Sequence, residues 1–162
     1  MKPIKSQLWL SLIAGAASLF CATQLMAECA NPAEYSSLNM RALQSELMVA
    51  ALACGQRESY NHFVKSPSSN LVTHGQHLRS YFSRQYGGRG EYHMNKFVTQ
   101  MANQASRISL NQSSSAYCQQ AAELFDYVRH AGRGEITRLA ADRYTAWHNV
   151  ASCHEAVVAE AR

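Results

Sequence analysis

Six stretches of this chain carry apolar residues at the three- and four-residue spacing of an α-helix, and this spacing constrains the fold more than any other feature. No stretch alternates apolar and polar residues for long, and no Asn-Gly or Asp-Gly hairpin turn occurs. The sequence therefore predicts an all-α fold, a compact bundle of five to six helices joined by short turns. The expected helices span residues 38–54, 56–65, 70–86, 91–110, 116–131 and 135–151.

The helix expected over residues 38–54 is the element on which the others are predicted to pack. Its polar residues fall mostly away from one apolar face, which contains Leu43, Leu47, Ala50, Ala51 and Cys54. Ser36 or Ser37 is a suitable N-cap, and Gly55 is a suitable residue to end the helix. The residues before this helix, which include Pro32, are expected to be extended.

The first 27 residues resemble a secretory signal peptide. Lys2 and Lys5 form a basic start, and residues 8–20 form an apolar run of 13, too short to span a bilayer as a helix. Cleavage is predicted after Ala27. Lipidation of Cys21 is an alternative, but the bulky phenylalanine before this cysteine disfavours it.

Residues 28–162 are expected to form a single helical domain in a periplasmic or secreted protein. Removal of the leader leaves 13 basic and 11 acidic residues, a net charge of about +2. The arginines are scattered among the acids, a pattern that argues against nucleic-acid binding. No second apolar run reaches the length of a transmembrane helix.

Four cysteines remain after the leader, and an even count in an exported chain indicates two disulfides, for which three pairings exist. Cys54 and Cys118 both fall on apolar helical faces, while Cys29 and Cys153 lie near the two ends of the domain. We therefore favour the pairs Cys54–Cys118 and Cys29–Cys153. No Cys-x-x-C motif of a redox or zinc site occurs.

One short motif resembles an enzyme family. Residues 57–61, Arg-Glu-Ser-Tyr-Asn, followed by Ser66-Pro67, are similar to the Glu-Ser motif of lytic transglycosylases and goose-type lysozymes. This resemblance implies that Glu58 is a general acid that cleaves peptidoglycan, which requires an apolar setting that raises its pKa. The family's Gly-Leu-Met-Gln stretch is missing, however, and residues 70–73 read Asn-Leu-Val-Thr. The alternative is a solvent-facing acid in a first helical turn.

Histidines offer a weak metal hypothesis. His74 and His77 are three residues apart on one predicted helix, a spacing that can chelate a metal ion. His148, Cys153 and His154 form a second, looser group. Neither group has an obvious complete ligand set, so we expect ordinary packed or surface histidines, no metal and no cofactor.

An aromatic and arginine-rich segment is a candidate binding face, because tyrosine and arginine are enriched at interaction hot spots. Its residues are Arg79, Tyr81, Arg84, Tyr86 and Arg89. The alternative, which we favour, is a helix whose aromatic residues belong to the core and whose arginines are solvated.

Several segments together resemble an uncharacterised family of small exported helical proteins of Gram-negative bacteria. They are residues 43–48 up to Cys54, then 60–64, 81–87 and Cys118. This resemblance implies a periplasmic, disulfide-bonded helical domain and brings no catalytic residues. Our first hypothesis is thus a non-catalytic module that binds a protein or envelope component, and the glycosidase based on Glu58 is the alternative.

Overall fold

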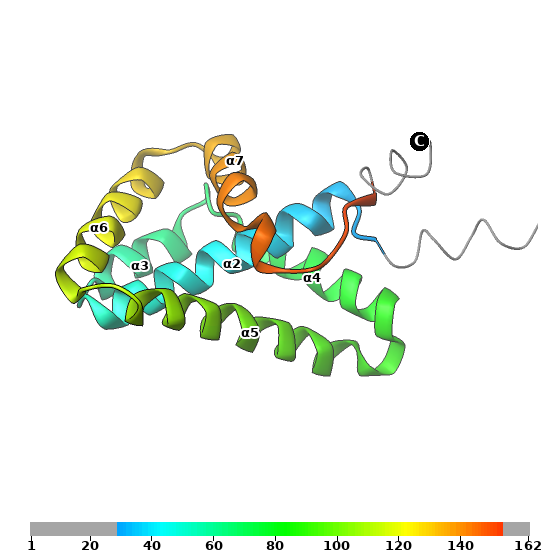
Figure 1. Ribbon diagram of the computed structural model, residues 1–162. Coiled ribbons are helices and arrows are strands. Elements are labelled where there is room, and N and C mark those ends of the chain that lie inside the picture. The colour runs from blue at the N-terminus through cyan, green and yellow to red at the C-terminus, as the bar shows by residue number, and fades with distance from the viewer. Residues whose placement is uncertain (1–28, 154–162) are drawn as a thin grey trace, which may run out of the picture.

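The computed structural model describes residues 29–153, and within this range it contains six α-helices and two short 3₁₀ helices (Figure 1). The predicted all-α fold is therefore confirmed. The predicted leader and His154 lie outside the described residues. The elements are α2 (Pro32–Ala53), α3 (Arg57–Lys65), α4 (Leu71–Tyr86), η1 (Gly87–Arg89), α5 (Gly90–Leu110), α6 (Ser114–His130), α7 (Arg133–Tyr144) and η2 (Thr145–Trp147). No helix in this range is long and apolar enough to cross a membrane.

Helix α2 runs through the centre of the bundle, and each of the other five α-helices packs against it (Figure 1). Leu38, Leu43 and Leu47 are fully buried in it. Burial is not confined to one apolar face, because polar residues such as Asn39 and Glu46 are buried too. Neighbouring helices therefore surround α2 and cover more of it than the predicted apolar face.

The start of α2 also differs from the prediction. The helix begins at Pro32, and its N-cap is Asn31 rather than Ser36 or Ser37. The Asn31 side chain accepts a hydrogen bond from the Glu34 backbone N–H, and the Glu34 carboxylate accepts one from the Asn31 N–H, both at 3.0 Å. Proline is well suited to the first helical position because that position needs no N–H donor, so the expected extended lead-in is replaced by a capped helix.

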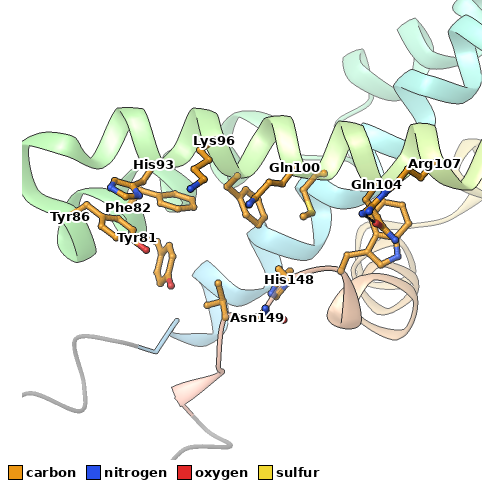
Figure 2. Close-up of a pocket in the computed structure, with 14 residues that line it drawn as sticks. Tyr81, Phe82, Tyr86, His93, Lys96, Gln100, Gln104, Arg107, His148 and Asn149 are labelled. Atoms are coloured by element: carbon orange, nitrogen blue, oxygen red, sulfur yellow. Dashed lines mark hydrogen bonds between the residues drawn. The ribbon is translucent and has the colours of Figure 1, made fainter.

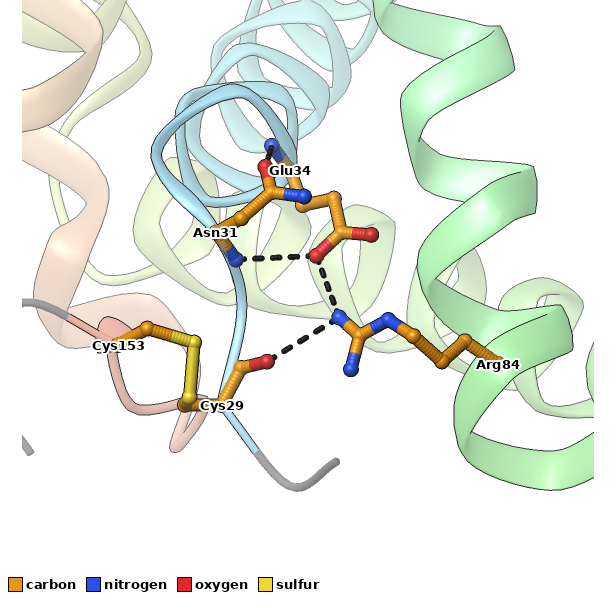
Figure 3. Close-up of a disulfide and its surroundings, with 5 residues drawn as sticks. All are labelled: Cys29, Asn31, Glu34, Arg84 and Cys153. Atoms are coloured by element: carbon orange, nitrogen blue, oxygen red, sulfur yellow. Dashed lines mark hydrogen bonds and ion pairs between the residues drawn. A yellow bond between two sulfur atoms is a disulfide. The ribbon is translucent and has the colours of Figure 1, made fainter. Parts of the chain in front are cut away.

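The two ends of the described chain are fastened together beside this cap (Figure 3). Cys29 and Cys153 form a disulfide, and the Ala30 N–H donates to the Ala151 carbonyl at 2.9 Å. Arg84 of α4 donates to the Cys29 carbonyl at 3.2 Å and to the buried Glu34 carboxylate at 2.5 Å. The cap, the disulfide and α4 thus hold one another in place.

The second disulfide joins Cys54, at the end of α2, to Cys118, in the second turn of α6. Both disulfides have the pairing that the sequence favoured. Helix α2 is consequently cross-linked near both ends, to the last described residue at one end and to α6 at the other.

The last predicted helix ends earlier than expected. It was predicted over 135–151, but α7 ends at Tyr144 and is followed by η2 and by non-helical chain. The Cys153 N–H donates to the Ala30 carbonyl at 3.0 Å, so this segment uses its backbone to pair with the start of the domain. The early end leaves residues 147–150 free to form one side of the groove described below.

We expect Gly90→Ala to lower the free energy of unfolding by about 1–3 kcal/mol, because a larger side chain would force two packed helices apart. A Cβ at Gly90 would lie 2.8 Å from the Phe82 carbonyl oxygen in α4. Gly75→Ala in α4 is the control, since the added Cβ would meet nothing within 4 Å. Alanine is also more favourable than glycine inside a helix by about 1 kcal/mol. Urea unfolding followed by circular dichroism measures both, and equal stability of the two variants would contradict this close approach.

Candidate functional site

A groove with a volume of about 480 Å³ lies between α5 and the chain that follows α7 (Figure 2). The end of α4 contributes Tyr81, Phe82 and Tyr86 to its lining. Helix α5 forms one wall, and the opposite wall consists of Trp147, His148, Asn149 and Val150. We call this feature the α5 groove.

The base of the α5 groove is apolar and aromatic. Phe82, Phe97 and Met101 line it and are almost fully buried, and the two phenylalanine rings lie 5.6 Å apart. At one end, the rings of Tyr86 and His93 stack in parallel with centroids 3.7 Å apart. Such a base can bury the apolar part of a ligand.

Polar side chains follow the α5 wall at intervals of three or four residues. Lys96, Gln100, Gln104 and Arg107 all line the groove, and Figure 2 shows Lys96 and Gln100 directed toward the opposite wall. Arg107 donates a hydrogen bond to the Gln104 side chain. Within the described residues, no ion pair involves Lys96 or Arg107, and no aspartate or glutamate lines the groove. The groove therefore has a positive charge near each end and no balancing negative charge.

His148 in the opposite wall is held in one tautomer. The Asn39 side-chain nitrogen donates to Thr145 Oγ1 at 3.4 Å, so the Asn39 oxygen faces His148 Nε2 at 3.0 Å and must accept its proton. Nδ1 is then an unprotonated acceptor, and it has no hydrogen-bond partner in the described structure. Burial lowers the pKa of His148 to about 4, so the ring stays neutral at pH 7.

This burial predicts a pH dependence of stability. Between pH 6.5 and about 4, the unfolded chain binds a proton at His148 and the folded chain does not, so the free energy of unfolding falls as the pH decreases. We expect His148 to contribute about 1–2 kcal/mol of this loss. This is less than its lowered pKa would give for a fully buried group, because the side chain is only half-buried. The measurement compares urea unfolding of the wild type and His148→Gln at pH 7 and pH 4.5. An identical pH-dependent loss in both proteins would contradict the prediction.

The candidate binding face of the sequence does not form one surface. Tyr81 and Tyr86 line the α5 groove, but Tyr81 is nearly buried. Arg84 is engaged with Glu34 and the Cys29 carbonyl. Arg79 and Arg89 are exposed and are not among the residues that line the groove. The five residues therefore divide between core, ion pair and solvent.

The two candidate metal ligands do come together, but around a serine. Ser37 Oγ donates to the Ala33 carbonyl at 2.6 Å, so it accepts a hydrogen bond from His74 Nδ1 at 2.9 Å. His77 Nδ1 lies 3.4 Å from the same oxygen. Burial, with a contribution from neighbouring positive groups, lowers the pKa of His74. In the described part of the chain, no group of three or more His, Cys, Asp or Glu side chains could hold a metal ion.

Glu58 lies in the first turn of α3, exposed to solvent, and does not line the α5 groove. Besides Glu34, the buried carboxylate among residues 29–153 is Glu46 of α2, which accepts a hydrogen bond from Arg143 at 2.7 Å. Tyr117 and Tyr144 are buried close by, and burial raises the pKa of Tyr117 to about 12. This arrangement balances a buried charge inside the helix bundle, which is a structural role.

Sequence reasoning did not identify Lys96, Gln100, Gln104 or Arg107 as site residues, and it considered His148 only as a loose metal candidate. A signal for the first four existed, because they form a polar row at helical spacing beside the apolar face of α5. No such signal existed for His148, whose partner Asn39 is 109 residues away.

Comparison of the chain with protein-family models, curated proteins and solved structures finds no match.

Proposed function

We propose that this chain is a non-catalytic binding module of the periplasm or the extracellular space, and that its ligand occupies the α5 groove. The observation that carries the proposal is the groove itself, which combines a buried aromatic base with positive charges along one wall that have no ion-pair partner among residues 29–153. Apolar concave sites with a few directed polar groups are the usual form of a binding site.

The proposed compartment is supported by the two disulfides and by the leader-like residues 1–27. Disulfides persist in oxidising compartments and are rare in the cytoplasm. The basic start and short apolar run of the leader are typical of export signals. The resemblance to small exported helical proteins supports the same assignment.

Binding is favoured over catalysis by the chemistry of the groove. The residues that line it include no carboxylate, serine, threonine or cysteine, which are common nucleophiles and acids in hydrolytic enzymes. Of its two histidines, His148 donates to Asn39 through one ring nitrogen and its other ring nitrogen is buried, while the His93 ring is stacked on Tyr86. Glu58 is exposed on another part of the molecule, so no observation favours the glycosidase hypothesis.

A photo-crosslinking experiment tests the proposed binding role. A benzophenone amino acid is placed at exposed Gln100 in the groove and, as a matched control, at exposed Arg129 on α6, in cells that naturally produce the chain. We expect a discrete adduct from position 100 that is absent from position 129. No adduct from position 100, or the same adducts from both positions, would contradict the proposal.

A further inference from the structure

We infer that the ligand of the α5 groove is an extended acidic peptide segment with carboxylates five residues apart and small apolar side chains between them. This inference rests on the proposed function and specifies its ligand. Three features of the groove carry it, namely charge, length and hydrogen-bonding capacity.

The charge of the groove selects an anion. Lys96 and Arg107 line it without an ion-pair partner among the described residues, and no acid lines it. A carboxylate brought to either residue forms a charge-assisted hydrogen bond, and arginine can bind it with two N–H groups. A basic or neutral segment would leave both charges unpaired.

The distance between these charges selects an extended ligand. Lys96 and Arg107 are eleven residues apart on one helix, α5, which corresponds to about 16 Å along its axis. A peptide in β conformation advances about 3.3 Å per residue, so carboxylates at its first and sixth positions span the same length. A compact anion such as free phosphate could meet only one end.

The hydrogen-bonding groups between the charges suit a peptide backbone. Gln100 and Gln104 carry both donors and acceptors, as the N–H and C=O groups of an extended chain require. Across the groove, the exposed Asn149 side chain also carries a donor and an acceptor for such a backbone. The buried Phe97 and Met101 beneath them provide an apolar surface for the side chains in the centre of the segment.

Fluorescence anisotropy with defined peptides tests this inference on the oxidised full-length chain. The probe is a labelled, end-capped hexapeptide with glutamate at its first and sixth positions and alternating serine and valine between them. We expect its glutamine analogue, and an analogue with the glutamates three residues apart, to bind at least about tenfold more weakly. Equal binding of all three peptides would overturn the inference.

Protein variants locate the binding. Lys96→Gln and Arg107→Gln are each expected to weaken binding about fivefold, whereas the matched changes Lys65→Gln and Arg138→Gln, which lie outside the groove, leave it within about twofold. Gln100→Glu should weaken binding more than Gln100→Lys, because only the glutamate repels the ligand. Peptide binding that none of the groove variants changes would overturn both the inference and the proposed groove.

Two further outcomes separate the ligand class from the binding role. If the protein binds an anionic glycan, hexagalacturonate, and not the peptides, the peptide inference is overturned. If Gln100→Glu then abolishes binding of the glycan, the α5 groove is still supported as the binding site. Residues 155–160, Glu-Ala-Val-Val-Ala-Glu, lie outside the described residues and have the inferred pattern. If Glu155→Gln with Glu160→Gln tightens probe binding at least about tenfold, the groove instead accommodates the chain's own end.

Discussion

Replacing Cys54 and Cys118 together with alanine is expected to lower the free energy of unfolding by about 4 kcal/mol. The two cysteines are 64 residues apart in the sequence, and the disulfide between them restricts the unfolded chain by closing this long loop. The cross-link also fixes the end of the central helix α2 to α6. Urea unfolding of the oxidised proteins, followed by circular dichroism, measures the loss.

The single variants are the control for this prediction. Cys54→Ala and Cys118→Ala each remove the same bond, so each should cost nearly as much as the double variant. The measurement is made at pH 6, where little thiolate is available to exchange with the disulfide between Cys29 and Cys153. Losses in the single variants that add up to the loss in the double variant would indicate packing effects, and would contradict the cross-link as the source of stability.

The helices could be predicted from the sequence because their apolar spacing is a local property. Helices α4 and α5 begin and end within a residue of the predicted positions, since Gly87 and the residues after Leu110 interrupt the pattern. The start of α2 was missed because Pro32 was interpreted as extended, although Asn31 and Glu34 provide a capping box that is visible in the sequence.

The α5 groove could not be predicted in the same way, because its two walls meet only through tertiary contacts. The wall at His148 depends on a hydrogen bond to Asn39, 109 residues earlier, and on the disulfide between Cys29 and Cys153. Helical spacing continued past Tyr144, so the sequence predicted more helix where the chain instead turns toward Ala30. Periodicity reports which residues share a face and does not report which distant segment covers that face.

Phe63→Ala is expected to lower the free energy of unfolding by about 3–4 kcal/mol, because it removes the side chain that anchors α3. Phe63 is the buried residue of this nine-residue helix and is only 1% exposed. Helix α3 packs between α2 and α6, and a helix this short is unstable without such packing. Loss of the ring leaves a cavity that neighbouring residues fill only in part. Urea unfolding gives the global loss, and hydrogen exchange of residues 57–65 shows whether α3 separates first.

Val64→Ala is the matched control, since Val64 is the next residue of the same helix. The structure leaves Val64 39% exposed, although Phe63 beside it is buried. An exposed valine contributes little packing, and alanine favours helix, so this variant should change stability by less than about 0.5 kcal/mol. A large loss at Val64 would mean that α3 is rotated about its axis relative to the structure described here. Exchange protection retained in α3 of Phe63→Ala would show that contacts such as that between Gln44 and Tyr60 suffice to hold this helix.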